Sequence, residues 1–151
     1  MEVYLDNCST TKPREEVIQE MLYCLKREYG NPSSLHRMGL NIEKKIESAR
    51  ENIGSFLDVN KDEIYFTSGG TESNNIAIQG IINKYSRQGK HIITTGIEHP
   101  SILNTMKYYE QKGFDITYLK VDNYGIISLD ELLKSIREDT ILISIMQVNN
   151  E

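Results

Sequence analysis

From Lys61 onward, short apolar runs alternate with longer segments of helical periodicity. The apolar runs predict strands at Glu63–Thr67, His91–Thr95, Asp115–Val121 and Thr140–Gln147. The segments between them predict helices at Glu72–Ser86, Ser101–Gln111 and Leu129–Ile136. Strands that alternate with helices build right-handed βαβ units around a parallel sheet. The alternation therefore predicts an α/β fold in which helices cover the sheet.

The first part of the chain has helical periodicity. Pro13 suits the first turn of a helix, and apolar residues then recur at helical spacing at positions 17, 18, 21, 22 and 25. A second amphipathic helix is predicted from about Leu40 to Leu57, after a loop at Gly30–Ser34. We therefore predict a helical N-terminal segment at residues 1–60 and an α/β domain at residues 61–151.

Composition excludes several classes of function. The formal net charge is −5 and no basic cluster stands out, so nucleic-acid binding and anionic-membrane binding have no electrostatic support. The sequence has no apolar run long enough to span a membrane and no signal peptide, which favours the cytoplasm. Cys8 and Cys24 lack a metal-ligand spacing, and we predict that both are small buried filler residues.

The segment Thr67–Asn75 joins a predicted strand to a predicted helix and is rich in small residues. Gly69 and Gly70 allow close backbone approach, and Thr71 adds a hydroxyl donor. Exposed N–H groups at the positive end of a helix dipole can hold a phosphate. An ordinary capped helix fits the same spacing equally well. The segment matches neither the dinucleotide pattern G-x-G-x-x-G nor the P-loop pattern.

Five segments in order carry a family resemblance. They are Tyr4–Asn7 with Ser9–Thr11, Gly30–His36, Thr67–Asn75, Glu98–Ile102 and Val148–Glu151. Together they resemble the pyridoxal-phosphate enzymes of aminotransferase class V, and specifically the cysteine desulfurases that supply sulfur for iron–sulfur clusters. The resemblance implies an incomplete large domain of the PLP-dependent transferase fold (fold type I). It also implies pyridoxal 5'-phosphate as cofactor and a homodimeric parent enzyme.

The same resemblance assigns roles to individual residues. Gly70 and Thr71 match the turn that cradles the cofactor phosphate. His99 matches a histidine that stacks on the pyridine ring and assists proton transfer, and it follows a predicted strand at the edge where α/β sheets bind ligands. Asn150 matches the asparagine that hydrogen-bonds the cofactor's phenolic oxygen. His36 is left open between a functional and a structural role, and His91 is predicted to lie at the surface.

The parent enzyme implied by the resemblance converts L-cysteine to L-alanine. It carries the sulfur as a persulfide and passes it to an iron–sulfur scaffold or another sulfur-acceptor protein. The family's cofactor lysine stands in a Ser-x-His-Lys context, which no lysine of this sequence has. We therefore expect the front part of a longer enzyme, inactive by itself. The alternatives are another class V enzyme, such as an aminotransferase or lyase, and a non-catalytic binding module.

The family fold also predicts which strands are neighbours. Asp115–Val121, His91–Thr95 and Thr140–Gln147 are expected side by side, while Glu63–Thr67 is left without its normal partners. An unpaired apolar strand edge favours aggregation or exchange with another chain. We expect the isolated chain to be poorly soluble, to form a non-native pairing, or to rely on another chain.

Overall fold

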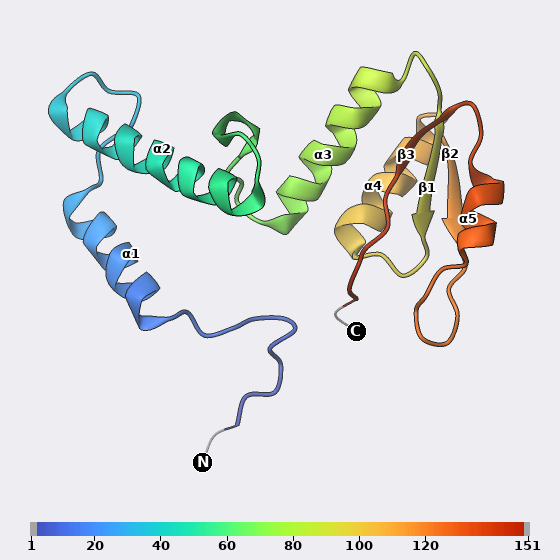
Figure 1. Cartoon of the computed structure of the whole chain (residues 1–151), viewed down its shortest axis with the longest axis horizontal. Coiled ribbons are helices and arrows are strands. Elements are labelled where there is room, and N and C mark those ends of the chain that lie inside the picture. Colours follow the sequence, from blue (N-terminus) through green and yellow to red (C-terminus); the bar gives the residue numbers. More distant parts are fainter. Residues whose placement is uncertain (1–2, 150–151) are drawn as a thin grey trace. The chain divides into compact units, whose positions relative to one another are not determined.

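The computed structural model describes residues 3–149 (Figure 1). Its elements, in chain order, are α1 (Glu15–Arg27), α2 (Arg37–Leu57), the 3-10 helix η1 (Lys61–Glu63), α3 (Gly70–Tyr85), β1 (His91–Thr95), α4 (Pro100–Gln111), β2 (Asp115–Leu119), α5 (Leu129–Ser135) and β3 (Thr140–Ile143). The chain divides into two compact units between Phe66 and Thr67. The change of sequence pattern lies slightly earlier, at residues 60–61.

The second unit contains a parallel sheet in the order β2-β1-β3. Ile92 of β1 lies opposite Ile116 of β2 and Leu142 of β3. The predicted parallel arrangement of these three segments is therefore confirmed. The β1 strand has the predicted bounds, because it is central and every one of its residues is buried. The other two strands end earlier than predicted, at Leu119 and Ile143.

The predicted strand at Glu63–Thr67 is wrong. Its first residue belongs to η1, whose Asn60 cap accepts the N–H of Asp62, while the Glu63 carboxylate accepts the N–H of Asn60. The next carbonyl, that of Ile64, accepts a hydrogen bond from the Arg50 guanidinium. A strand requires a neighbouring strand as hydrogen-bond partner. The described residues supply none to this segment, and no non-native pairing replaces it.

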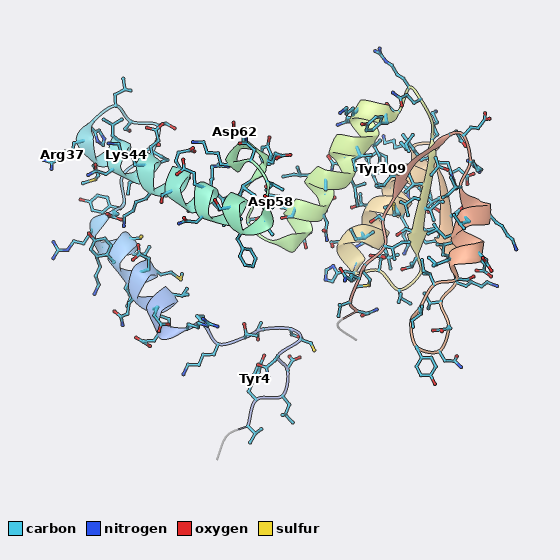
Figure 2. All side chains as sticks on the ribbon, in the orientation of Figure 1. Tyr4, Arg37, Lys44, Asp58, Asp62 and Tyr109 are labelled. Atoms are coloured by element: carbon cyan, nitrogen blue, oxygen red, sulfur yellow. The ribbon has the colours of Figure 1, made fainter. Side chains whose placement is uncertain are left out.

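The core lies on the face of the sheet that α3 and α4 cover. Ile78 and Ile82 of α3, Ile102 and Met106 of α4, and Ile92 of β1 form one buried cluster. The burial of each such side chain contributes roughly 1.5–3 kcal/mol. Tyr109, which Figure 2 labels, extends this packing. Its ring makes an edge-to-face contact with Phe114, with 5.4 Å between the ring centroids. The helix α5 follows β2 and contacts it.

The first unit is packed differently. Among its described residues no hydrophobic side chain is buried, although many line α1 and α2. Charges contribute to its packing, because Lys45 of α2 forms ion pairs with Glu20 of α1 and with Glu28, the residue that caps the end of α1. None of the helices among residues 3–149 is long and apolar enough to cross a membrane.

The cysteine prediction fails for Cys8. This residue is exposed in a polar turn, where Asp6 accepts the backbone N–H of Ser9 and no apolar element covers the thiol. Cys24 is half-buried on α1, and its thiol lies 3.7 Å and 3.9 Å from carboxylate oxygens of Glu20 and Glu28. Desolvation and the nearby carboxylates raise the pKa of Cys24. A raised pKa disfavours the reactive thiolate.

Candidate functional site

The carboxyl end of β1 leads through a short loop into α4, and His99 caps that helix. Its Nδ1 accepts the backbone N–H of Ser101 at 3.1 Å and lies 2.8 Å from the Ser101 hydroxyl. Pro100 occupies the first turn, where its missing N–H costs nothing. The sequence thus fixes both the start of α4 and the position of the imidazole. The ring itself is exposed.

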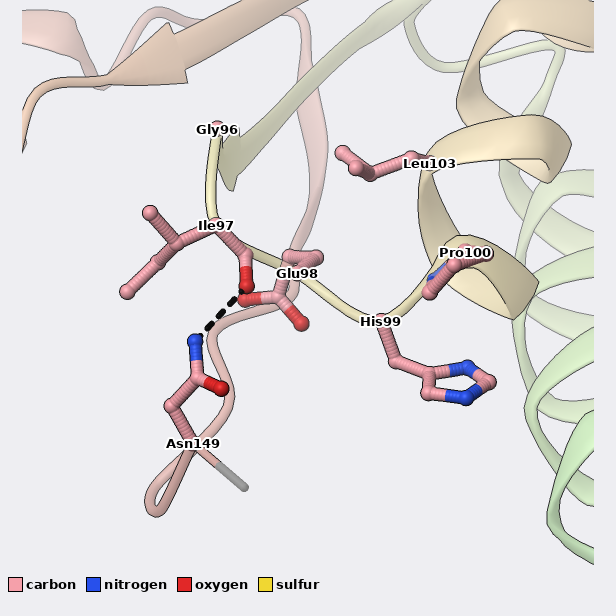
Figure 3. A pocket seen from close by; sticks show the side chains of 7 residues that line it. All are labelled: Gly96, Ile97, Glu98, His99, Pro100, Leu103 and Asn149. Carbon is pink, nitrogen blue, oxygen red and sulfur yellow. Dashed lines mark hydrogen bonds between the residues drawn. The ribbon is translucent and has the colours of Figure 1, made fainter. Parts of the chain in front are cut away.

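His99 lines a cavity of about 480 Å³. Figure 3 shows the side chains that surround it: Gly96, Ile97, Glu98, Pro100, Leu103 and Asn149. Asn149 approaches from the segment after β3 and donates a hydrogen bond to the Ile97 carbonyl at 3.1 Å. This contact ties the segment after β3 to the backbone of the loop after β1. Asn150, the predicted cofactor residue, lies outside the described residues.

Glu98 is a residue whose importance sequence reasoning missed. Its side chain is buried, and one carboxylate oxygen accepts the Thr95 hydroxyl at 3.0 Å and the backbone N–H of Met146 at 2.7 Å. A carboxylate is costly to bury unless such donors compensate it. These bonds tie the loop after β1 to the segment that carries Asn149. An acidic residue next to a strand-end histidine was the available signal.

The start of α3 carries the other two predicted site residues, Gly70 and Thr71. Gly69 precedes the helix without a side-chain cap, and the backbone N–H groups of Gly70 and Thr71 have no acceptor among the described residues. A Cβ added at Gly69 or Gly70 would meet open space. Glu72 folds back onto the Ser68 N–H at 2.6 Å, and this hydrogen bond lowers the pKa of Glu72. The donors at the end of the helix therefore remain open to an anion.

A hydrogen bond joins the two helix starts. The Asn74 amide on α3 donates to the Ser101 hydroxyl on α4 at 2.9 Å, and Ser101 in turn contacts His99. One turn further along, the Thr105 hydroxyl donates to Asn75 at 2.8 Å. Thr71 and Ser101 line one cavity of about 340 Å³. The structure thus brings the start of α3, with Gly70 and Thr71, to the helix start that His99 caps.

The other two histidines have structural positions. His36 caps α2 in the first unit, where its Nδ1 accepts the Gly39 N–H at 3.2 Å. The prediction of a surface position for His91 is wrong, because the residue is fully buried. Its ring joins the three strands: Nδ1 lies 2.7 Å from the Thr140 hydroxyl and Nε2 lies 2.8 Å from the Thr117 hydroxyl. Desolvation lowers the pKa of His91, and the charge of Arg137 adds to that effect.

Comparison with protein families decides where this chain belongs, because the model described as aminotransferase class V matches residues 3–151. The chain belongs to the aminotransferase class V family. It is 51% identical over 150 residues to a cysteine desulfurase IscS of Dictyoglomus turgidum, and the alignment covers 99% of this chain and 38% of that relative. A cysteine desulfurase IscS of Methanosarcina thermophila is 50% identical, and the alignment covers 99% of this chain and 37% of that relative.

Similar solved structures agree with this assignment. A NifS-like protein superimposes with a TM-score of 0.96 and 44% identity over 100% of this chain and 42% of its own. The structure of SspA in complex with cysteine superimposes with a TM-score of 0.91 and 38% sequence identity, and the match covers 98% of this chain and 43% of the SspA chain. The predicted similarity to cysteine desulfurases and the predicted fold are confirmed. The chain spans less than two-fifths of the curated relatives' length.

Proposed function

We propose that this chain is part of a pyridoxal-phosphate-dependent cysteine desulfurase, which converts L-cysteine to L-alanine and holds the sulfur as an enzyme persulfide. The observation that carries the proposal is the hydrogen bond from Asn74 to Ser101, which sets the open start of α3 beside the helix start that His99 caps. An anion-binding helix end next to an imidazole suits a phosphorylated ring cofactor. The similarity to cysteine desulfurases supports the choice of reaction.

Each residue has a role in this proposal. The Gly70 and Thr71 N–H groups and the Thr71 hydroxyl hold the cofactor phosphate, since these donors are exposed at the positive end of α3. His99 contacts the cofactor ring and holds a proton on its imidazole for transfer. Asn150 hydrogen-bonds the cofactor through its neutral amide. When bound, pyridoxal phosphate supplies the electron sink for chemistry at the substrate's α-carbon.

We propose further that the chain does not turn over cysteine by itself. Neither of the two cavities at the site has a lysine among its described lining residues. That observation favours a second candidate function, a non-catalytic binding module that keeps the phosphate-binding half of the site. For the whole enzyme we propose a homodimer in the cytoplasm that donates sulfur to an iron–sulfur scaffold or another acceptor. Residues 61–151 then form the first part of its cofactor-binding domain.

The phosphate site can be tested by nuclear magnetic resonance on the ¹⁵N-labelled chain. Adding pyridoxal phosphate should shift the backbone amide signals of Gly70 and Thr71, and inorganic phosphate should compete for the same site. The start of α5 is an internal control, because the Ser128 hydroxyl already caps it by accepting the Glu131 N–H. Equal shifts at both helix starts, or none at Gly70 and Thr71, would overturn the proposed phosphate site.

A substitution and an assay complete this test. Thr71→Val should weaken binding of the cofactor about ten-fold, the effect of a lost hydrogen bond of about 1.5 kcal/mol to a charged group. The chain with added cofactor should release no sulfide from L-cysteine. After borohydride reduction, mass spectrometry should find no single labelled lysine. Sulfide above a no-protein control would show that the chain completes a catalytic site by itself.

A further inference from the structure

The hydrogen bonds around His99 determine which ring nitrogen carries the proton. The backbone N–H of Ser101 can only donate, and it points at Nδ1 from 3.1 Å. The Nδ1 atom must therefore offer its lone pair, which places the proton of the neutral ring on Nε2. Among the described residues Nε2 has no hydrogen-bond partner. The bound nitrogen is held at the first turn of α4, and the other nitrogen is left to a ligand.

The Ser101 hydroxyl extends this arrangement to a second helix. It lies 2.8 Å from Nδ1, and it accepts the Asn74 amide at 2.9 Å. Because Asn74 supplies a hydrogen atom to this oxygen, the hydroxyl's own hydrogen can be donated to Nδ1. Ser101 is 7% exposed, so water does not compete freely for these groups. Each group in this series thus donates its hydrogen to the next, from the Asn74 amide to the Ser101 hydroxyl and from that hydroxyl to His99 Nδ1.

We propose that Asn74 and Ser101 are positioning residues for His99: the Ser101 hydroxyl, oriented by Asn74, reinforces the Nε2–H form that the backbone N–H of Ser101 favours, with that proton available at the cavity. The proposal deepens the proposed function and rests on it, since the Nε2 proton serves chemistry only if a cofactor or substrate occupies the cavity. The tautomer itself depends on the hydrogen bonds alone. It can therefore be measured without any ligand.

Replacing the amide donor of Asn74 with a carboxylate, which only accepts, gives the decisive variant. In Asn74→Asp the new carboxylate can only accept, so it takes the Ser101 hydroxyl hydrogen. The Ser101 oxygen then presents lone pairs to His99 and favours a proton on Nδ1. In Asn74→Asp combined with Ser101→Ala no hydroxyl is left to pass this change on. The backbone N–H of Ser101, which the substitution leaves in place, then sets the tautomer alone, and the ring should return to the Nε2–H form. An effect of charge through space would persist in the double variant.

The neighbouring asparagine provides a matched control. Asn75→Asp introduces the same charge one residue away, but Asn75 pairs with the Thr105 hydroxyl and the Thr71 carbonyl instead of Ser101. We expect Asn75→Asp to leave the His99 nitrogens unchanged, even where it lowers stability. Far-UV circular dichroism of each variant establishes that it is folded before its tautomer is interpreted.

The measurement is a long-range ¹H–¹⁵N correlation spectrum of the histidine rings in the cofactor-free 151-residue chain at about pH 8.5, where histidine is neutral. The His99 signals are identified by their loss in His99→Gln. We expect an unprotonated Nδ1 in the wild type, a several-fold larger Nδ1-protonated fraction in Asn74→Asp, and reversal in the double variant. A wild-type tautomer mixture, no response to Asn74→Asp, or an equal response to Asn75→Asp would overturn the proposal. Failure to bind pyridoxal phosphate would instead count against the proposed function, leaving this result intact.

Discussion

At the scale of single residues, His91 shows how a polar group can be built into a sheet. The ring lies at the start of the central strand and bonds to threonines of both neighbouring strands. Burial opposes its charged form, and the positive charge of Arg137 acts in the same direction. Asp115 and Asp139, which pair with Arg137, act in the opposite direction and are smaller effects. The lowered pKa of His91 therefore favours its neutral form in the folded protein.

The lowered pKa of His91 predicts a loss of stability in mild acid. Because the unfolded chain binds a proton with a pKa of about 6.5 and the folded chain binds it only at lower pH, stability falls as the pH drops below about 6.5. The free energy of unfolding, from urea titrations at about pH 5 to 8, should fall by at most about 1.4 kcal/mol per pH unit from this group. A flat profile in that range would contradict the prediction.

His91→Gln is the matching control for this pH dependence. It cannot titrate, so the slope between about pH 5 and 6.5 should be reduced relative to the wild type. The variant should also be less stable at about pH 8, by roughly 1–3 kcal/mol, because buried threonine hydroxyls lose a partner. The carboxyl groups with lowered pKa, Glu72 and Asp139, titrate at more acidic pH and do not interfere.

At the scale of elements, Gly80 and Gly89 have opposite environments. Gly80 lies in the middle of α3, is exposed, and a Cβ there would meet no atom within 4 Å. Gly89 lies in the turn before β1, and a Cβ there would lie 2.1 Å from the carbonyl oxygen of Asp139. Backbone atoms cannot move away as a flexible side chain can. The turn requires a glycine, whereas the helix does not.

Alanine substitutions should separate these two cases. Gly80→Ala should stabilise the chain by up to about 1 kcal/mol, since alanine is the better helix former. Gly89→Ala should destabilise it by at least about 1–3 kcal/mol, because β3 must shift away from β1. Urea unfolding of both variants in parallel measures the two effects. Equal changes of the same sign would show that the close approach at Gly89 does not constrain the sheet.

The elements also show how far sequence patterns can predict structure. The bounds of β1 could be predicted because Gly89 and Gly96 stand on either side of a short run of strand-forming residues. The end of β3 could not be predicted. The run of strand-forming residues continues to Gln147, but Met146 donates its N–H to the Glu98 carboxylate rather than to a neighbouring strand. The error at Glu63–Thr67 has a similar origin, because periodicity does not reveal whether a partner strand exists.

The candidate site was predictable to a similar extent. His99, Gly70 and Thr71 were predicted from a strand end, a glycine-rich helix start and the family resemblance, and the structure places them at two helix starts that a hydrogen bond joins. The link between them was not predicted, because Asn74 and Ser101 are far apart in sequence and neither residue type is unusual at its position. His91 was misplaced for the same reason. Its threonine partners lie on two other strands, and only the sheet register brings them together.

At the scale of the whole molecule, the two units differ in how much apolar surface they bury. The second unit has a buried cluster that joins α3, α4 and β1. In the first unit large apolar side chains stay exposed, including Leu25 at 72% and Phe56 at 88%. Protection from hydrogen exchange follows buried contacts and protected hydrogen bonds. The family relatives are more than twice as long as this chain, so their chains contain further surface that could cover these residues.

This difference predicts unequal protection along one chain. Hydrogen exchange measured by mass spectrometry should find the slowest amides in β1 and α4 and much faster exchange in α1, because α1 has no buried residue and β1 is buried throughout. The experiment is repeated at several protein concentrations, since exposed apolar faces favour self-association. If α1 becomes protected only as concentration rises, a second copy covers it. Equal protection of α1 and β1 at the lowest concentration would instead show that the first unit is as stable as the sheet.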